Sequence, residues 1–339
     1  MKLALDAMGG DYAPQEIVLG GLDALNQYDF MEKLYLVGKR DAIEAVLKEA
    51  EKNQKIDYNK LEIVEASEVI EMDDHPATAY RRKKDASITV ATRLVKEGTA
   101  DAVVSAGSTG GQMVSALFGL GRIKGVNRPA IGCIIPTYEG GKLLVDAGAN
   151  TNVDENNLVQ FAQMGSIYMN CVMGMENPRV GLINNGSEET KGSELTQAVY
   201  QRLKEMPDLN FVGNLEGRDV PFGRADVMTC DGFTGNVVLK TMEGMAKVIM
   251  EMLQEEVYAS TRGKVGGMLL KPSLRNLKKK MDYAEYGGAP LLGVNGVSVV
   301  CHGSSKARAI FKAIEVANTC CESRFVEKIK GKYETKSEQ

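Results

Sequence analysis

Glycines and small polar residues follow several apolar runs at the points where a strand pattern gives way to a helix pattern. Three such loops cover residues 105–111, 232–236 and 302–305. Exposed backbone N–H groups, hydroxyls and the helix dipole make loops of this kind good anion sites. Because ligands of open α/β sheets bind at the carboxyl ends of strands, we expect these loops to share one edge of the sheet.

The candidate phosphate- and substrate-binding residues lie in these loops and in the glycine turn after the first strand. They are Asp6, Gly9, Gly10, Ser105, Gly107, Ser108, Thr109, Gly110, Thr234, Asn236, His302 and Ser304. Neither GxxxxGK[ST] nor GxGxxG occurs, so nucleotide binding has no direct support. His302 is a candidate acid, base or phosphate donor, although a histidine at a helix start is more often a structural hydrogen-bonding residue.

Lys191 and Asp231 are the charged pair that we expect to be catalytic, because each follows a strand in a glycine-bearing loop. A lysine there can balance a phosphate or a developing oxyanion. An aspartate there can orient the lysine or act as a base. The structural alternative for both is an ordinary salt bridge or a helix cap.

Cysteines and histidines limit the other kinds of chemistry. The six cysteines show no CxxC spacing, and we interpret them as reduced thiols of an intracellular protein. With only two histidines, His75 and His302, a His-rich metal site is impossible. Cys230, next to Asp231, is a candidate nucleophile, although a cysteine at a strand end is more often a buried small residue.

Short apolar runs alternate with helix patterns and predict an α/β fold, a mostly parallel sheet with helices on both faces. The strand-like runs are residues 2–7, 33–38, 61–66, 100–107, 130–136, 142–148, 179–186, 225–232 and 296–301. Residues 240–283 break the rhythm with two helix patterns and no strand, so we expect a helical hairpin there. We assign residues 1–333 to a single catalytic domain and residues 334–339 to a flexible tail.

Charge and hydropathy exclude some classes of partner. The net charge of -4 and the absence of Trp argue against a nucleic-acid-binding surface. No run approaches the ~18–20 apolar residues of a membrane span, and the N-terminus is typical of a first strand rather than a signal peptide.

Two basic clusters remain, and the first, Arg81, Arg82, Lys83 and Lys84, is typical of a solvated helix face. The second, residues 261–281, has seven Lys or Arg and no acidic residue. A basic amphipathic helix with an apolar loop is typical of a membrane-surface element. Its expected membrane-facing residues are Met268, Leu269, Leu270, Leu274 and Leu277.

Long motifs spread over the chain resemble the bacterial phosphate acyltransferases of phospholipid synthesis, the PlsX family. They are LDAMGGDYAPQ (5–15), SAGSTGG (105–111), RPAIGCIIPT (128–137), VDAGAN (145–150), FVGNLEGRD (211–219), CDGFTGNVVLKTMEG (230–244), KKKMDYAEYGGAPLLGVNG (278–296) and HGSS (302–305). The resemblance covers residues 1 to about 330. Two positions depart from the common pattern: Ser108 stands where Asn is common and Asn185 where Ile is common.

The resemblance implies a fold similar to the isocitrate and isopropylmalate dehydrogenases and to phosphotransacetylase. It implies transfer of a long-chain fatty acyl group from acyl carrier protein to inorganic phosphate, giving acyl phosphate for a membrane glycerol-3-phosphate acyltransferase. It further implies a cytoplasmic homodimer that attaches peripherally to the inner face of the cell membrane. No metal or nucleotide is required, because the thioester already carries the activation.

Direct attack of a phosphate oxygen on the thioester carbonyl is the mechanism that we expect, since phosphate is already anionic and needs positioning above all. The loops at 105–111 and 302–305 would hold phosphate, Lys191 would stabilise the oxyanion or neutralise phosphate, and Asp231 would hold Lys191 or assist proton transfer. Either basic cluster would suit the acidic carrier protein. The alternatives are an NAD-linked dehydrogenase of similar fold and a non-catalytic lipid- or carrier-binding regulator.

Overall fold

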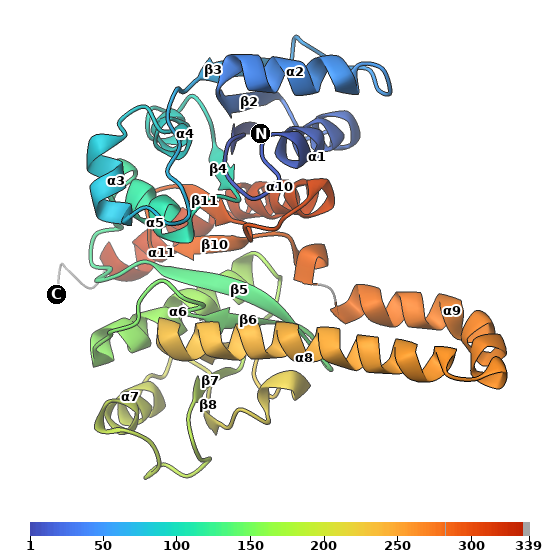
Figure 1. Ribbon diagram of the computed structural model, residues 1–339. Helices are drawn as coiled ribbons and strands as arrows, with labels where there is room; N and C mark the ends of the chain where they lie inside the picture. The colour runs from blue at the N-terminus through green and yellow to red at the C-terminus, as the bar shows by residue number, and fades with distance from the viewer. Residues whose placement is uncertain (282, 335–339) are drawn as a thin grey trace.

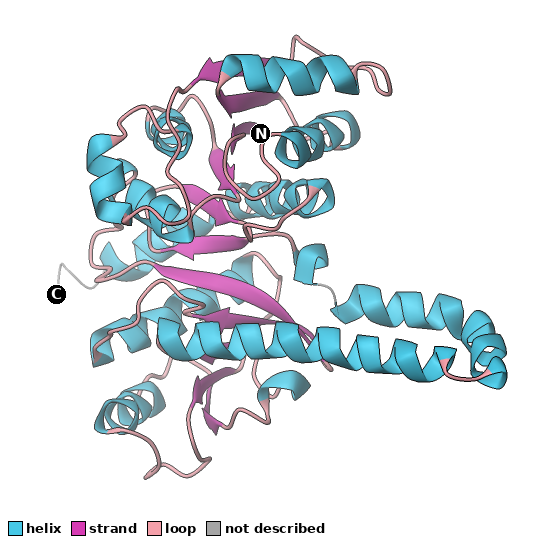
Figure 2. Cartoon of the chain, viewed as in Figure 1, coloured by secondary structure: helices cyan, strands magenta, loops and turns pink. Residues whose placement is uncertain are grey.

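A single wide sheet with helices on both faces forms the body of the molecule (Figures 1 and 2). The computed structural model describes residues 1–281 and 283–334. Within these residues, eleven strands are arranged in the order β3-β2-β1-β4-β11-β10-β5-β6-β9-β7-β8. The expected α/β class is therefore confirmed, with a mostly parallel sheet.

The strands are β1 (Lys2–Asp6), β2 (Lys33–Gly38), β3 (Leu61–Glu65), β4 (Ala102–Ser105), β5 (Ala130–Thr137), β6 (Gly140–Val145), β7 (Val180–Ile183), β8 (Phe211–Leu215), β9 (Val227–Thr229), β10 (Ala289–Leu292) and β11 (Val297–Val300). The helices are α1 (Gln15–Gln27), α2 (Arg40–Ala50), α3 (Pro76–Arg82), α4 (Ser87–Lys96), α5 (Thr109–Gly119), α6 (Glu155–Cys171), α7 (Glu194–Lys204), α8 (Gly232–Tyr258), α9 (Thr261–Met281), α10 (Ala307–Glu322) and α11 (Phe325–Glu334). Two short 3-10 helices cover Val220–Phe222 and Tyr283–Tyr286.

The central strands are apolar because both faces of the sheet are covered. In β1, Leu3 and Leu5 belong to the large cluster that includes α1 and α10, whereas Ala4 packs on the other face with α4. Successive side chains of a strand point to opposite faces, so a doubly covered strand needs apolar residues at every position. This explains the unbroken apolar runs of the sequence.

Strand direction reverses in the middle of the sheet. Strands β1, β2, β3, β4 and β11 run parallel to one another, as do β6, β7, β8 and β9, but β10 is antiparallel to β11 and to β5, and β5 is antiparallel to β6. The last residue of β6, Val145, lies opposite Gly132 near the start of β5, and that start lies beside the end of β10. The carboxyl ends of β6 and β9 are therefore level with the amino end of β11.

This reversal corrects the expectation that the three small-residue loops share one edge. Residues 105–111 and 302–305 follow β4 and β11, whereas residues 232–236 follow β9 at the opposite edge. The connection between β5 and β6 consists of two residues, Tyr138 and Glu139, which allow only an antiparallel hairpin. We call the edge at the carboxyl ends of β1, β4 and β11 the first edge, and the other the second edge.

Two strands, β8 and β10, are absent from the expected strand runs. In β8, Asn214 and Gly213, whose φ is +94°, interrupt the apolar pattern. β10 has only four residues, including Pro290. Both are short, and their sequences carry residues that are uncommon in strands.

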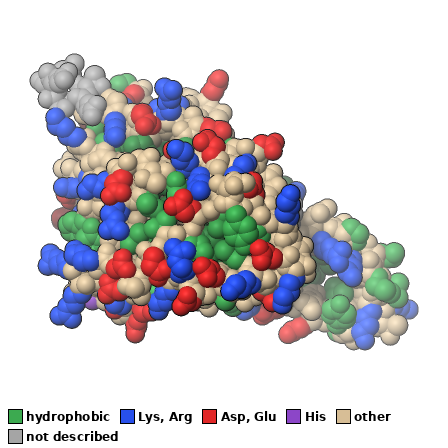
Figure 3. Space-filling model, turned by 90° about the horizontal axis from the view of Figure 1, so that it is seen from above, with side chains coloured by type: hydrophobic (Ala, Val, Ile, Leu, Met, Phe, Trp, Pro, Cys, Tyr) green, Lys and Arg blue, Asp and Glu red, His purple; other side chains and the backbone are tan. Residues whose placement is uncertain are grey.

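Helices α8 and α9 form a long hairpin that projects beyond the sheet (Figure 1). α8 begins at Gly232, eight residues before the expected hairpin, and α9 continues through Gly266, Gly267 and Pro272. In Figure 3, hydrophobic and basic side chains cover much of this projecting part. No helix within the described residues is both long and apolar enough to cross a membrane. Residues 335–339 of the expected tail lie outside the described residues.

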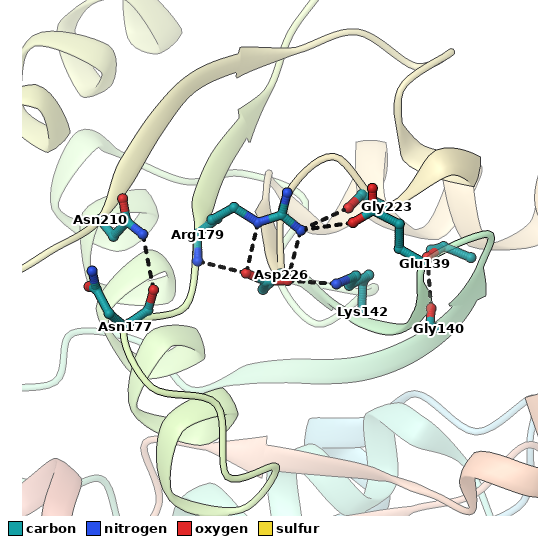
Figure 4. A network of polar contacts seen from close by, with 9 residues as sticks. Glu139, Gly140, Lys142, Asn177, Arg179, Asn210, Gly223 and Asp226 are labelled. Carbon is teal, nitrogen blue, oxygen red and sulfur yellow. Dashed lines mark hydrogen bonds and ion pairs between the residues drawn. The ribbon is translucent and has the colours of Figure 1, made fainter.

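A buried ion network stabilises the amino ends of β7 and β9 (Figure 4). Lys142 Nζ lies 2.6 Å from Asp226 Oδ1, and Arg179 Nε lies 3.1 Å from Asp226 Oδ2. Arg179 also donates to Glu139 at 3.1 Å and to the Gly223 carbonyl at 3.3 Å. Lys142 and Asp226 are 5% and 8% exposed, so each charge depends on its partners for the interactions that water would otherwise supply.

Candidate functional site

Three loops at the first edge are in direct contact and form what we call the cradle: residues 6–11, 105–108 and 302–305. The backbone N–H of Asp11 donates to Gly303 O at 2.8 Å, and that of Cys301 donates to Ser105 O at 2.8 Å. A Cβ on Gly9 would lie 2.6 Å from the Gly107 nitrogen. Glycine at position 9 therefore permits a close approach of two backbones that any other residue would prevent.

A buried carboxyl lies beneath the cradle. Ser105 Oγ donates to Asp6 Oδ2 at 2.6 Å and accepts from the Gly107 N–H at 3.0 Å. Burial raises the pKa of Asp6, and the hydrogen bonds from Ser105, Ser87 and the Met8 N–H oppose that shift. A raised pKa reduces the repulsion between this carboxyl and an anion in the cradle.

Helix α5 begins at the cradle, with its amino end directed to the loops. Ser108 is the N-cap, and its Oγ accepts from the Gly111 N–H at 3.3 Å. Thr109 is exposed at this end, and Gly110 packs so closely on Pro76 that a Cβ would lie 2.5 Å from Pro76 Cγ. The first turn of α5 thus adds N–H groups and two hydroxyls to the same place.

The sheet has two halves of opposite strand direction, one containing β1 to β4 with β11 and the other containing β6 to β9. His302 follows β11 in the first half and contacts α8, which follows β9 in the second. Its Nε2 is 2.9 Å from Lys240 Nζ on α8, and its Nδ1 is 2.8 Å from Ser304 Oγ. Lys240 is in turn 2.8 Å from Glu243 Oε2. α8 starts at the second edge, and eight residues at 1.5 Å each carry Lys240 about 12 Å along the helix toward the first edge. A cation from one half therefore reaches the cradle of the other.

A cleft of about 480 Å³ opens beside the cradle. Its lining comes from the turn after β1, the loop before α3 and the start of α5: Met8, Gly9, Gly10, Asp11, Val69, Ile70, Glu71, Met72, Asp73, Gly107 and Ser108. Four of these side chains are apolar and three are acidic. The cleft is large enough for part of an extended organic substrate next to an anion in the cradle.

At the second edge, the loop after β6 is built around Asp146, which is fully buried. Its carboxylate accepts from the N–H groups of Ile131 at 3.0 Å, Ala149 at 3.0 Å and Asn150 at 2.7 Å. Burial raises the pKa of Asp146, whereas these donors favour the ionised form. A Cβ on Gly235 would lie 1.9 Å from Asp146 O, so this loop fixes the start of α8.

The expected catalytic pair also lies at the second edge. Asp231 is the N-cap of α8: Oδ1 accepts from the Thr234 N–H at 2.9 Å and Oδ2 from Thr234 Oγ1 at 2.7 Å. Asn236 is exposed one turn further on, and Lys191 is exposed in the loop after β7. Among the described residues, Lys191 and Asp231 form no ion pair. Within the described residues, no hydrogen bond or ion pair joins Lys191, Asp231, Thr234 or Asn236 to the cradle of their own chain.

Cys230 is 3% exposed, and its Sγ lies 3.9 Å from the Asp146 carbonyl oxygen. Burial raises the pKa of the Cys230 thiol well above its ordinary value, and nearby Asp231 and Asp146 raise it further. The thiolate that would attack a thioester is therefore disfavoured.

In the first basic cluster, residues 81–84, Lys83 is paired within the chain and the other three side chains are exposed. Lys83 Nζ donates to Val69 O at 2.8 Å and pairs with Asp74, so it stabilises the loop that lines the cleft. Arg81, Arg82 and Lys84 are exposed at the end of α3, with Lys84 Nζ 5.0 Å from the centre of the Tyr80 ring.

The residues expected to face a membrane lie on α9. Met268, Leu269 and Leu270 are 68%, 79% and 54% exposed, and Leu277 is also exposed, whereas Leu274 is half-buried.

Lys240 and Asp146 were not among the residues expected from sequence. Asp146 follows an apolar strand within VDAGAN, which is a usable signal for a functional or structural carboxylate. Lys240 has no such local signal, because its relation to His302 depends on how far α8 extends along the sheet. No set of three or more His, Cys, Asp or Glu side chains within the described part of the chain could hold a metal ion.

Comparisons with known proteins agree with this architecture. The family model described as "Fatty acid synthesis protein" matches residues 1–328. A phosphate acyltransferase of Desulfitobacterium hafniense (strain DSM 10664 / DCB-2) is 56% identical over 331 residues, which cover 97% of each chain.

Two solved structures share the fold. The EutD phosphotransacetylase from Staphylococcus aureus has a TM-score of 0.58 at 15% identity, covering 95% of this chain and 94% of that one. The 4-hydroxythreonine-4-phosphate dehydrogenase from Klebsiella pneumoniae has a TM-score of 0.54 at 10% identity, covering 94% and 99%. Transferases and dehydrogenases share this fold, so the fold alone does not decide the reaction.

Proposed function

This chain belongs to the family of phosphate acyltransferases, and we propose that it forms acyl phosphate from inorganic phosphate and a long-chain fatty acyl group carried by acyl carrier protein. The observation that carries the proposal is the cradle, where three glycine-bearing loops, the start of α5 and Lys240 converge beside a cleft. Such a convergence of N–H groups, hydroxyls and one cation suits a phosphate dianion.

The proposed reaction is a direct displacement at the thioester carbonyl. An oxygen of hydrogen phosphate forms a bond to the carbonyl carbon, the carbon–sulfur bond breaks, and the proton of the phosphate finally resides on the released carrier thiol. The cradle positions the nucleophile, and the cleft receives the thioester end of the acyl chain against Met8, Val69 and Met72. Positioning of this kind can supply most of the rate enhancement.

Direct attack is preferred over an acyl-enzyme on Cys230. The buried thiol with its raised pKa supports that preference, as does its place at the second edge. Neither a metal nor another cofactor takes part in the proposed reaction.

Lys191 and Asp231 keep their proposed catalytic roles in a modified form. Because they follow strands of the second edge, we expect them to serve the cradle of the second copy in a homodimer rather than that of their own chain. Lys191 would there stabilise the oxyanion or the phosphate charge, and Asp231 would support it.

The proposed partners follow from the exposed surfaces. Arg81, Arg82 and Lys84 are accessible to the acidic carrier protein, whereas Lys83 is occupied by Val69 and Asp74. The tip of the α8–α9 hairpin combines exposed leucines with basic residues and suits an anionic membrane surface. We therefore propose a cytoplasmic enzyme, peripherally attached to the inner face of the cell membrane, that passes acyl phosphate to a membrane glycerol-3-phosphate acyltransferase.

The test is the formation of acyl phosphate from purified long-chain acyl carrier protein and inorganic phosphate, with release of the free carrier thiol in equal amount. Both products should appear without added metal or nucleotide. A reaction that requires NAD would indicate the dehydrogenase alternative. Binding of acyl carrier protein without turnover would indicate a non-catalytic regulator.

A further inference from the structure

The chain Glu243–Lys240–His302–Ser304 is a continuous series of polar contacts that ends in the cradle. The contacts measure 2.8, 2.9 and 2.8 Å in that order. Two of the residues come from α8 and two from the loop after β11, so the series joins elements from the two halves of the sheet.

The direction of the hydrogen bonds follows from the chemistry of the lysine. An ammonium group only donates, so Nε2 of His302 accepts from Lys240. A neutral imidazole then carries its proton on Nδ1, and Ser304 Oγ accepts a hydrogen bond from this N–H. The Ser304 N–H is directed at Nδ1 as well, at 3.2 Å, and would donate to it in the Nε2–H tautomer. The ammonium group 2.9 Å from Nε2 excludes that tautomer, because two donors would then face each other. With Nδ1 as the donor, the hydroxyl of Ser304 keeps its own proton for donation.

We propose that Lys240 is a positioning residue for phosphate: it fixes the Nδ1–H tautomer of His302 and thereby makes the Ser304 hydroxyl a donor to phosphate in the cradle. Glu243 holds the Lys240 side chain in this position. The inference rests on the proposed function, since it assigns the phosphate-binding part of that reaction.

Physical reasons favour this role over a purely structural one. The side chain of Lys240 is 45% exposed, so the contact with His302 contributes little to stability in water. A phosphate oxygen gains most from a hydroxyl whose other hydrogen bond is already directed elsewhere, because no reorientation is then required on binding. The contact therefore acts on ligand binding more than on folding.

The first experiment is independent of activity and uses ¹⁵N NMR of the histidine rings. The sequence contains only His75 and His302, and His75→Gln assigns the two sets of signals. In mildly alkaline buffer the wild-type protein should show His302 as the Nδ1–H tautomer. Lys240→Met should convert it largely to the Nε2–H tautomer, and Lys240→Arg, which also only donates, should restore Nδ1–H. A wild-type Nε2–H tautomer would overturn the proposal.

The second experiment measures kinetics with phosphate as the varied substrate. Lys240→Met should raise the KM for phosphate about tenfold or more, equivalent to about 1.4 kcal/mol, with a smaller effect on kcat. Ser304→Ala should show the same loss, and the double variant should show no further loss, because the two residues act in series. Lys247→Met is the matched control: this lysine lies on the same helix beside Glu251, is 78% exposed and should leave the kinetics unchanged.

The outcomes separate the two proposals. If the wild-type protein forms no acyl phosphate, the proposed function fails, and titration with inorganic phosphate followed by the His302 signals still decides the role of Lys240. An unchanged phosphate KM in Lys240→Met, or additive losses in the double variant, would refute the series of contacts as a phosphate-positioning device while leaving the acyl transfer intact.

Discussion

Replacing Asp226 by alanine should destabilise the protein strongly, because it leaves a buried lysine without a partner. Lys142 Nζ lies 2.6 Å from Asp226 and its side chain is 6% exposed, whereas Arg179 is 37% exposed and keeps its contacts with Glu139 and Gly223. Breaking a buried ion pair from one side costs about 3–5 kcal/mol. The expected loss therefore comes mainly from Lys142.

Urea unfolding at neutral pH measures this free energy. The matched control is Glu62→Ala, which breaks the exposed pair with Lys33, whose atoms lie 3.3 Å apart and whose side chains are 26% and 54% exposed. That control should cost about 0–1 kcal/mol. The double variant Lys142→Met/Asp226→Leu should lose less than Asp226→Ala, because it leaves no buried charge without a partner: Arg179 is partly exposed and keeps Glu139 and Gly223.

The effect also has a predictable pH dependence. Burial alone would raise the pKa of Asp226, but hydrogen bonds from Arg179 and Lys142 outweigh it and hold the pKa below its ordinary value. A depressed pKa stabilises the fold above the ordinary aspartate range near 3.9 and ceases to do so as the carboxylate is protonated in acid. The difference between wild type and Asp226→Ala should thus persist from neutral pH to about pH 5 and shrink below about pH 4. A loss under about 1 kcal/mol at neutral pH would show that Lys142 is not desolvated as argued.

Three further predictions concern the proposed reaction. Lys191→Ala should lower turnover a few hundredfold, equivalent to about 3–4 kcal/mol. Mixing the Lys191→Ala protein with the Ser105→Ala protein should restore part of the activity in mixed dimers. If no activity returns, both residues serve the site of a single chain. Cys230→Ser should keep substantial activity, and an acyl adduct on Cys230, seen by mass spectrometry without phosphate and then transferred to it, would contradict direct attack. Replacing Leu269, Leu270 and Leu274 by Ser should abolish sedimentation with anionic liposomes and leave acyl transfer in solution largely unchanged, whereas persistent sedimentation would exclude this segment as the membrane contact.

The sequence predicts the α/β class and most strands, because doubly covered strands require unbroken apolar runs. It predicts strand direction less well, because an apolar run such as 142–148 does not indicate whether its strand lies parallel or antiparallel to its neighbours. The signal for the reversal is the two-residue connection of Tyr138 and Glu139, which is too short for a parallel crossover. Because this connection makes β6 antiparallel to β5, it implies that the loop at 232–236 lies at the edge opposite the cradle.

The meeting of the cradle loops follows from the sequence in large part, whereas the contact of Lys240 with His302 does not. Asp6 and Ser105 are the last residues of β1 and β4, and His302 follows β11 at the same edge, so topology alone brings them together. Lys240 comes from the other half, in the third turn of a helix, and its place depends on the packing of Leu239 and Met242 against the sheet. Long-range packing of this kind has no local sequence signature.

Helix α8 fixes the distance between the cradle and the exposed part of the hairpin. Lys240 and Met252 lie on the same helix twelve residues apart, which fixes a spacing of about 18 Å. Between them lies Gly244, around which a Cβ would meet no atom within 4 Å. The length of this helical segment therefore sets how far the cradle lies from the exposed residues of the hairpin. Adding whole turns to α8 after Gly244, with matching turns in α9, would change that distance without moving Lys240.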